Sequence, residues 1–300
     1  PLLNFDLIRD IVEYNSGIPD PPLYKYSLIT NGTLLDKNKI KFFTKHNFSI
    51  QLSVPLQGES PQFDNKYLES SLNNLKILSE NDDITFSTNS VFTPSNIDKL
   101  TDHIEYLADF ELSEIGISFD HSQTWDGLIL NELSSQINRL TEREMKKFQK
   151  SRRSNINLFK KDKFHNKIKG CGAGNGQISV TPRGDIWGCD LFYYYFKNGT
   201  SNGDKGKYLF GNINDPDFNL SEHLDREIVE NYHEFRGDMY KTLDLPCFLC
   251  PYLKECHICP AILYRTEENN SMFFVPKHEC EINKILINAK RKFFSGTGGN

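Results

Sequence analysis

The chain has 300 residues, of which 38% are hydrophobic and 25% charged, and its formal net charge is −5. These proportions indicate a folded globular protein of one or two domains and argue against a disordered chain. The excess of acidic residues argues against a nucleic-acid partner. The short basic runs Lys150–Arg153 and Lys290–Lys292 are therefore interpreted as solvated faces. No apolar run reaches the ~18 residues of a membrane span and no signal peptide is visible, so we expect a cytoplasmic protein without a membrane partner.

The first 120 residues alternate between strand and helix periodicity. Strands are predicted over residues 24–30, 48–54, 84–91 and 115–119. Helices are predicted after the capping residues Asn4 and Asp36, around Leu68–Leu75, and from Thr93, with Thr93 as the N-cap and Pro94 as the first helical residue. This rhythm implies parallel strands joined by helical crossovers, and therefore an α/β sheet or a partial (β/α) barrel.

Polar residues stand at the carboxyl ends of the predicted strands, where folds of this class bind their ligands. They are Asn31, Ser53, Asn89 and Asp120. Polar residues also simply terminate strands, and the sequence by itself favours that interpretation. A helix over residues 128–148 and the polar stretch after it are interpreted as a bridge between domains, and His46 and His103 are expected on helical surfaces without a role.

All seven cysteines lie in the second half of the chain. They are Cys171, Cys189, Cys247, Cys250, Cys256, Cys259 and Cys280. The segment 247–259 reads C-x2-C-x5-C-x2-C, which gathers four soft ligands in one loop and suits zinc or iron–sulfur chemistry. An odd count in a chain of this length argues against a disulfide scaffold.

A β-hairpin is predicted around the first two cysteines. Residues 177–180 and 185–188 alternate as strands on either side of the turn Thr181-Pro-Arg-Gly184, which brings Cys189 back toward Cys171. Asp190 follows Cys189 directly, and the aromatic run 192–196 is expected to be core or pocket wall. An amphipathic helix is predicted after Cys280.

From the spacing alone, zinc and iron–sulfur clusters remain equally open. A zinc protein would use four cysteines at one site. The other site would use three cysteines and a histidine such as His165, His257 or His278.

The cysteine pattern, together with Gly184-Asp-Ile-Trp-Gly-Cys189 and Gly211-Asn-Ile213, resembles the SPASM domain of radical S-adenosylmethionine (radical SAM) enzymes. Ile29–Leu35 resembles the third-strand segment of the radical SAM partial barrel. The resemblance covers almost the whole chain and makes zinc a minor alternative. It implies an α/β fold with a partial radical SAM barrel over residues 1–125. A helical bridge over 126–170 and a small cysteine-rich SPASM domain with a β-hairpin over 171–300 would follow.

Two departures from the family pattern stand out. The C-x3-C-x2-C loop that binds the catalytic [4Fe-4S] cluster is absent, because residues 1–170 contain no cysteine, and Pro1-Leu2-Leu3 looks like the continuation of a Gly-Gly-Glu segment. We therefore expect that the first strand and the cluster loop are missing and that the chain is inactive alone. Pro55-Leu56 also stands where many members have Asp-Gly.

The resemblance implies two auxiliary [4Fe-4S] clusters and S-adenosyl-L-methionine as cofactors. One cluster would be held by Cys247, Cys250, Cys256 and Cys280, and the other by Cys171, Cys189 and Cys259 with a fourth ligand unidentified. Ser53 and Asn31 match positions that contact or lie near S-adenosylmethionine, and Asp190 matches an aspartate thought to take a proton from the substrate. Thiolate-bound clusters can accept an electron from an oxidised substrate, and a neighbouring carboxylate can accept the proton.

The function implied is radical-based oxidative modification of a peptide or protein side chain, by a ribosomal peptide maturase with a flavodoxin or ferredoxin as reducing partner. One alternative is an anaerobic sulfatase-maturating enzyme that forms formylglycine. The other, from a different class, is a non-enzymatic zinc-binding interaction module.

Overall fold

The computed structural model describes residues 1–19, 24–56, 65–80, 83–110, 112–160, 172–174, 176–197, 208–219, 247–256, 258–259, 261 and 275–298, with only the backbone of 65–68 and 195–197. The chain divides into two compact units. The first comprises residues 1–161 and 289–300, and the second comprises residues 162–288.

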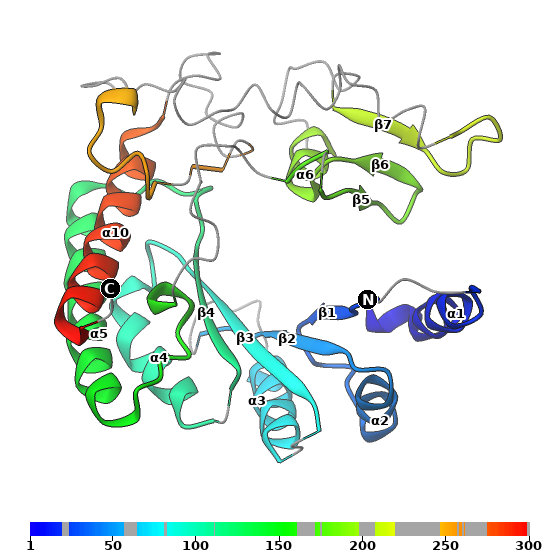
Figure 1. Ribbon diagram of the computed structural model, residues 1–300, viewed down its shortest axis with the longest axis horizontal. Coiled ribbons are helices and arrows are strands. Elements are labelled where there is room, and N and C mark those ends of the chain that lie inside the picture. The colour runs from blue at the N-terminus through cyan, green and yellow to red at the C-terminus, as the bar shows by residue number, and fades with distance from the viewer. Residues whose placement is uncertain are drawn as a thin grey trace. The chain divides into compact units, whose positions relative to one another are not determined.

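The first unit contains a parallel sheet of four strands in the order β1-β2-β3-β4 (Figure 1). The strands are β1 (Ser27–Thr30), β2 (Ser49–Ser53), β3 (Thr85–Phe92) and β4 (Glu114–Phe119). Period-two alternation gives β2 and the residue after it one apolar face, whose side chains are almost fully buried: Ile50 is 1%, Leu52 0% and Val54 2% exposed. The other face of the sheet carries mostly polar side chains, together with the exposed Ile29 and Val91.

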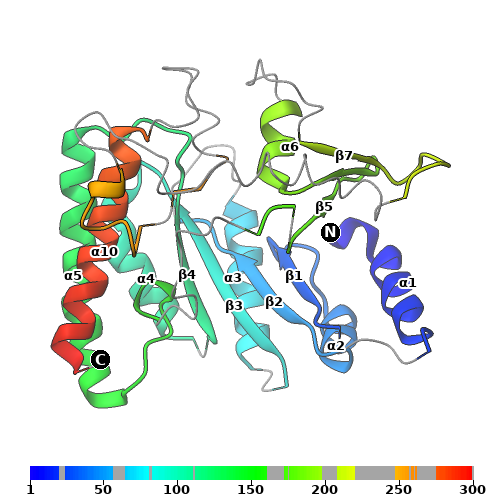
Figure 2. The same cartoon turned by 45° about the horizontal axis from the view of Figure 1, so that its top comes forward.

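Helices connect the successive strands and lie along one face of the sheet, as Figures 1 and 2 show together. They are α2 (Lys37–Lys45), α3 (Asn65–Ser79) and α4 (Leu100–Ala108), and the helices η1 (Leu2–Asn4) and α1 (Phe5–Ser16) precede β1. Asn4 and Asp36 cap α1 and α2 by accepting backbone N–H groups, as the sequence predicts. The predicted α/β fold with parallel strands is confirmed.

The helix predicted from Thr93 begins later than expected. Residues 94–96 form a turn in which Asn96 Oδ1 accepts the backbone N–H of Thr93 at 2.8 Å. The helical segment starts with η2 (Ile97–Lys99) and continues as α4. Asn96 therefore satisfies the backbone N–H of Thr93 as in a capping box, and the regular helix begins only after this turn, which the Thr-Pro signal does not reveal.

His103 was expected on a helical surface, and this is wrong. Its Nε2 lies 2.8 Å from Ser90 Oγ on β3, and burial lowers the pKa of the imidazole to about 4. His103 therefore belongs to the packing of α4 against the sheet as a neutral side chain.

The long helix α5 (Gly127–Ser151) belongs to the first unit, together with η3 (Asn157–Phe159). Gln136, which is 6% exposed, ties α5 to α4: its Oε1 accepts the hydroxyl of Thr101 at 2.6 Å and its Nε2 donates to Asp98 O at 2.7 Å. The predicted bounds differ here, because residues 126–160 belong to the α/β unit rather than standing between domains.

The final helix, α10 (Lys277–Thr297), crosses the boundary between the two units. Its last turns join the first unit, where Phe293 stacks on Phe159 with ring centroids 4.6 Å apart and meets Phe148 edge-on at 5.3 Å. Residues 289–300 therefore differ from the predicted assignment to the cysteine-rich domain. Among the helices that the structure describes, no stretch combines the length and apolarity needed to cross a membrane.

The second unit contains an antiparallel sheet in the order β5-β6-β7. Its elements are β5 (Ser179–Val180), β6 (Asp185–Trp187), α6 (Asp190–Lys197), β7 (Leu209–Asn212) and η7 (Cys247–Leu249). The hairpin β5–β6 turns at Gly184, whose φ of +86° lies in the left-handed region that favours glycine. The predicted hairpin is therefore confirmed.

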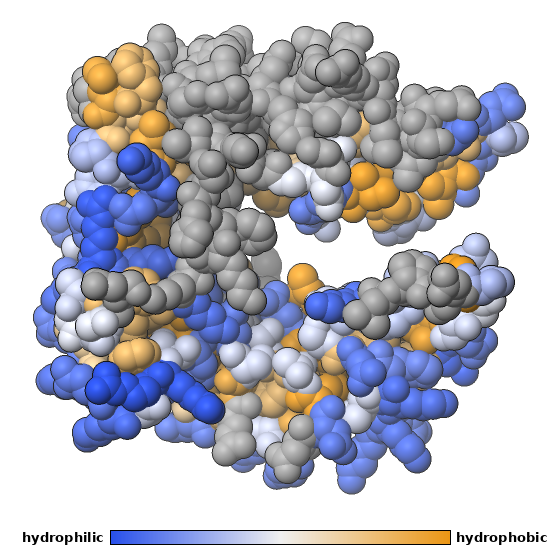
Figure 3. All heavy atoms as spheres, viewed as in Figure 1, coloured by the Kyte–Doolittle hydropathy of each residue, from blue (hydrophilic) through white to orange (hydrophobic). Residues whose placement is uncertain are grey.

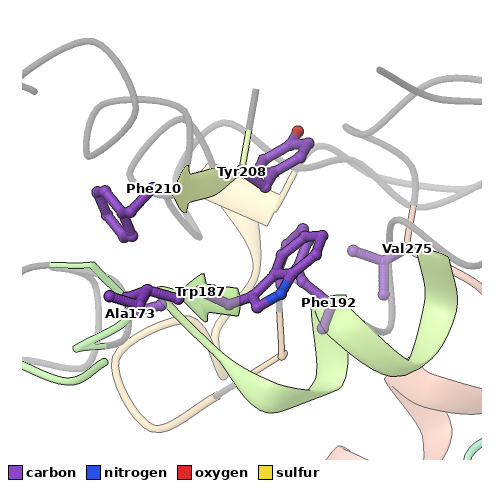
Figure 4. Packing of buried hydrophobic residues seen from close by; sticks show 8 residues of the cluster. Ala173, Trp187, Phe192, Tyr208, Phe210 and Val275 are labelled. Carbon is purple, nitrogen blue, oxygen red and sulfur yellow. The ribbon is translucent and has the colours of Figure 1, made fainter. Parts of the chain in front are cut away.

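An aromatic core holds the second unit together (Figure 4). Trp187 and Phe192 are at most 1% exposed, and the ring of Phe192 lies 4.8 Å from that of Tyr208. Phe192 is thus core, as expected for the aromatic run, whereas Tyr194 is 51% exposed. This core matters for function because four cysteines pack against it: Cys189, Cys247, Cys259 and Cys280.

Candidate functional site

The polar face of the parallel sheet is the first candidate site. Ser53 ends β2 and lies opposite Asn89 of β3, whose Oδ1 accepts the hydroxyl of Ser118 on β4 at 3.0 Å. These hydroxyl and amide groups stand toward the carboxyl end of the sheet, where parallel folds bind ligands. Among the described residues, the hydroxyl of Ser53 has no hydrogen-bond partner, so it is available to a ligand.

Gly116 makes room for this polar row. A Cβ built on Gly116 would lie 2.6 Å from Asn89 Oδ1 and 2.8 Å from Thr88 O, closer than side-chain carbons approach such atoms. The missing side chain therefore lets Asn89 extend across β4 to Ser118. Sequence reasoning noted Asn89 only as a strand end and missed Ser118, although the alternation Gly116-Ile-Ser118 opposite Asn89 carries the signal.

We expect Gly116→Ala to destabilise the protein by about 1–3 kcal/mol, because the added methyl group displaces Asn89 or the backbone of β3. The matched control is Gly127→Ala, where an added Cβ meets nothing within 4 Å and the change should stay within about 0.5 kcal/mol. Urea unfolding of both variants measures the difference. Equal unfolding midpoints would contradict the close approach at Gly116.

Asn31 and Asp120 also lie at the carboxyl ends of strands, but their oxygens serve local turns. Asn31 Oδ1 accepts the backbone N–H and the hydroxyl of Thr33, at 3.2 and 3.0 Å, which leaves its Nδ2 as a donor on the exposed side. The carboxylate of Asp120 accepts from Ser122 N and Gln123 Nε2. Of the predicted strand-end residues, Ser53 and the amide of Asn31 therefore remain suited to a carboxylate-bearing ligand.

Cys189 and Asp190 form the centre of the second candidate site. Cys189 follows β6 and Asp190 begins α6, so the end of the hairpin and the start of the helix hold the two side chains together. The thiol of Cys189 donates to Asp190 Oδ1 at 3.7 Å. Burial raises the pKa of Cys189 to about 11, and the negative charges of Asp190 and Cys259 contribute. Cys189 and Cys259, far apart in the sequence, are therefore neighbours in the fold.

A second group of thiols forms around Cys247. Burial raises its pKa to about 11, and the charges of Cys280 and Cys250 add to the shift. Cys280 lies near the start of α10, and burial raises its pKa as well, while the ammonium group of Lys284 one turn later opposes that shift. Sequence reasoning missed Lys284, although its position four residues after Cys280 on a helix is the signal that places it nearby.

The remaining predicted ligands are Cys256, Cys171 and the histidines that a zinc site would use. Cys256 lies in the same loop as Cys250, with its backbone N–H bonded to Tyr252 O at 2.8 Å. Cys171, His165 and His257 lie outside the described residues, and His278 Nε2 lies 3.6 Å from the carboxylate of Glu279. Within the described parts of the chain, no three His, Cys, Asp or Glu side chains are placed to hold one metal ion together.

The chemistry of the donor set nevertheless fits iron–sulfur clusters. The six described cysteines are free thiols, each neither fully buried nor fully exposed. Five of them form two groups, one of Cys189 and Cys259 and the other of Cys247, Cys250 and Cys280. Burial, with the charge of a neighbouring thiol, raises the pKa of Cys189, Cys247 and Cys280, so these thiols are unfavourable as bare thiolates and favourable once positive iron neutralises them. These residues would bind clusters through sulfur, with Lys284 offsetting the negative charge near Cys280.

The comparisons with known proteins agree with this fold. No protein-family model matches the chain. The radical SAM cyclopropyl synthase TigE of Paramaledivibacter caminithermalis is 23% identical over an alignment of 299 residues, which covers 96% of this chain and 57% of that protein. The chain thus spans little more than half the length of this curated relative.

Two solved structures share the fold. Native anSMEcpe with bound AdoMet matches with a TM-score of 0.71 and 17% identity over 98% of this chain and 81% of that one. Native anSMEcpe with AdoMet and the Kp18Cys peptide matches with a TM-score of 0.70 and 18% identity, over 99% and 82%. The predicted resemblance to radical SAM enzymes with a SPASM domain is therefore confirmed.

Proposed function

We propose that the chain is part of a radical SAM enzyme that oxidatively modifies a side chain of a peptide. The observation that carries the proposal is the meeting of Cys189, Asp190 and Cys259, which combines two thiols and a carboxylate beside one aromatic core. Support also comes from the similarity to a cyclopropyl synthase along 96% of the chain, and from solved relatives that hold AdoMet and peptides.

The two units would bind different cofactors. In the first unit, Ser53 Oγ and Asn31 Nδ2 would donate hydrogen bonds to the carboxylate of S-adenosylmethionine. In the second unit, two cysteine groups would hold the clusters, Cys247, Cys250, Cys256 and Cys280 for one and Cys171, Cys189 and Cys259 for the other. When bound, these cofactors supply radical chemistry and accept electrons.

Asp190 would accept the proton that leaves the substrate. Its side chain is exposed, and its carboxylate lies within hydrogen-bonding distance of the Cys189 sulfur, so a substrate carbon oxidised near that cysteine would lose its proton to Asp190. The reducing partner would be a flavodoxin or ferredoxin, as the family resemblance implies.

The test is mass spectrometry of peptides incubated anaerobically with the natural protein that carries this chain, S-adenosylmethionine and dithionite. The peptides are those encoded beside its gene, together with a cysteine-containing peptide as the probe of sulfatase-type maturation. A product that lacks two hydrogens but keeps all other atoms indicates a new bond or ring and supports the proposal. Loss of sulfur from the cysteine peptide alone would instead favour formylglycine formation, the second candidate.

A protein that binds stoichiometric zinc and modifies neither peptide would contradict both enzymatic functions. It would favour the zinc-binding interaction module, which uses the same cysteines as a structural site.

A further inference from the structure

The basic run near Lys150, which the sequence suggests is a solvated face, lines a hollow of the first unit. The hollow has a volume of about 820 Å³, within the ~300–1,000 Å³ of typical ligand pockets. It lies between the end of α5, the segment 151–160, the residues before β4 and the last turns of α10. Figure 3 shows hydrophilic side chains gathered over α5 and α10.

The rim of this hollow is cationic. Lys147, Arg152, Arg153 and Lys160 line it, and no acidic residue is among its described lining residues. Lys160 pairs with Glu114 at 2.6 Å, whereas the side chains of Lys147, Arg152 and Arg153 have no carboxylate partner within the described structure. Three cations around one hollow repel one another, and an anion between them removes that repulsion.

The backbone holds these cations in place. Arg152 ends α5 in the left-handed region with φ of 56°, a conformation that glycine or asparagine adopts at lower cost. The hydroxyl of Ser151 holds Arg153, because its oxygen accepts the Arg153 N–H at 3.3 Å. Its single proton lies within reach of both Arg153 O and Lys147 O, each 3.1 Å away. The two guanidinium groups therefore start from a defined turn rather than from a frayed helix end.

The floor of the hollow is apolar. Leu112 and Phe159 are buried and Phe148 and Phe294 half-buried, and Phe159 is stacked on Phe293. A free phosphate ion gains nothing from an aromatic floor, and a folded protein surface does not enter a hollow of this size. A short peptide with carboxylates and an apolar side chain satisfies both the rim and the floor.

We propose that this hollow, called the groove from here on, binds an acidic segment of the polypeptide substrate, remote from the residue that is modified. This rests on the proposed function, because it assumes a peptide substrate. The groove adjoins the amino end of β4, whereas Ser53 and Asn31 stand at the carboxyl ends of their strands, so it is separate from the cofactor-binding edge of the same sheet. Affinity of the groove for the substrate would therefore affect KM and leave the bond-forming chemistry unchanged.

The experiment measures fluorescence anisotropy of a labelled peptide of glutamate, aspartate and phenylalanine against the natural protein, without S-adenosylmethionine or added iron. The Lys147→Gln, Arg152→Gln and Arg153→Gln triple variant should bind about tenfold more weakly, as expected for the loss of three partly exposed ion pairs. The matched control is a second triple variant, with Lys41→Gln, Lys146→Gln and Lys150→Gln. It removes the same charge outside the groove and should bind the peptide as the wild type does.

A second measurement needs no variant and therefore does not depend on folding of the triple mutant. On the wild-type protein, a peptide with glutamine and asparagine in place of the acids should not bind, and added salt should weaken binding of the acidic peptide. Equal binding of both peptides, unchanged binding by the groove variant, or displacement by inorganic phosphate as strong as that by unlabelled acidic peptide would overturn the proposal.

These outcomes are distinct from failure of the proposed function. If the acidic peptide binds but no peptide is modified, the proposed function is contradicted and the proposal for the groove stands. Modification whose KM is the same for acidic and neutral versions of a substrate would contradict the groove alone.

Discussion

Replacing Asp190 by asparagine should lower product formation about 10²–10⁴-fold, the usual contribution of a positioned base. The carboxylate of Asp190 lies 3.7 Å from the sulfur of Cys189 at the start of α6, and asparagine keeps its size while removing the basic site. In the proposed reaction the substrate loses a hydrogen atom before it loses the proton, so formation of 5′-deoxyadenosine and cluster content should both persist. Anaerobic assays of the natural protein that measure product, 5′-deoxyadenosine and iron together test this.

Asp217→Asn is the matched control, because Asp217 is an exposed acid of the same unit in the turn after β7. Its activity should stay at the wild-type level. If Asp190→Asn also forms product normally, Asp190 is only a neighbour of Cys189. If that variant instead loses iron, Asp190 acts as a structural residue or as a cluster ligand.

The reconstituted protein should contain about eight iron atoms per chain from the second unit, as two four-iron clusters require, and removing one cysteine should remove only the cluster it binds. Cys280→Ala should lose about four of these iron atoms, because Cys280 is grouped with Cys247 and Cys250. Cys189→Ala should lose the other four, because Cys189 is grouped with Cys259. Iron analysis and absorbance near ~400 nm measure both.

Val275→Ala is the control for this pair of variants. Val275 is 1% exposed in the same aromatic core but carries no metal-binding atom, so its truncation should cost stability and leave iron content unchanged. Parallel loss of all iron in both cysteine variants would show a single shared site. Stoichiometric zinc without iron would show that the metal assignment is wrong.

The arrangement of the first unit explains how one sheet can offer two separate surfaces. Parallel strands place all their carboxyl ends at one edge, so Ser53, Asn89 and the segment at Asn31 gather there without any special contact between them. The residues just before β4 lie at the opposite edge, beside the ends of α5 and α10, where Phe293 packs on Phe148 and Phe159. A substrate long enough to reach both edges would be bound at two points, which raises its effective concentration at the site.

Local signals in the sequence determined the elements and the types of ligand. Period-two and helical periodicity predicted the four strands and their helices, the caps Asn4 and Asp36 fixed two helix starts, and the turn at Gly184 fixed the hairpin. The cysteine spacing indicated metal chemistry by itself. The predictions of the strands, the caps and the hairpin succeed because each depends on residues a few positions apart, whereas the metal chemistry stays a prediction.

The tertiary structure alone decided which distant residues meet. It brought Cys259 to Cys189, joined α5 and the end of α10 to the sheet, buried His103 against Ser90, and assembled the cationic rim above an aromatic floor. No local pattern encodes these contacts, because they depend on how separate elements pack to bury apolar surface. The sequence therefore determined which groups are present, and packing determined which of them can act together.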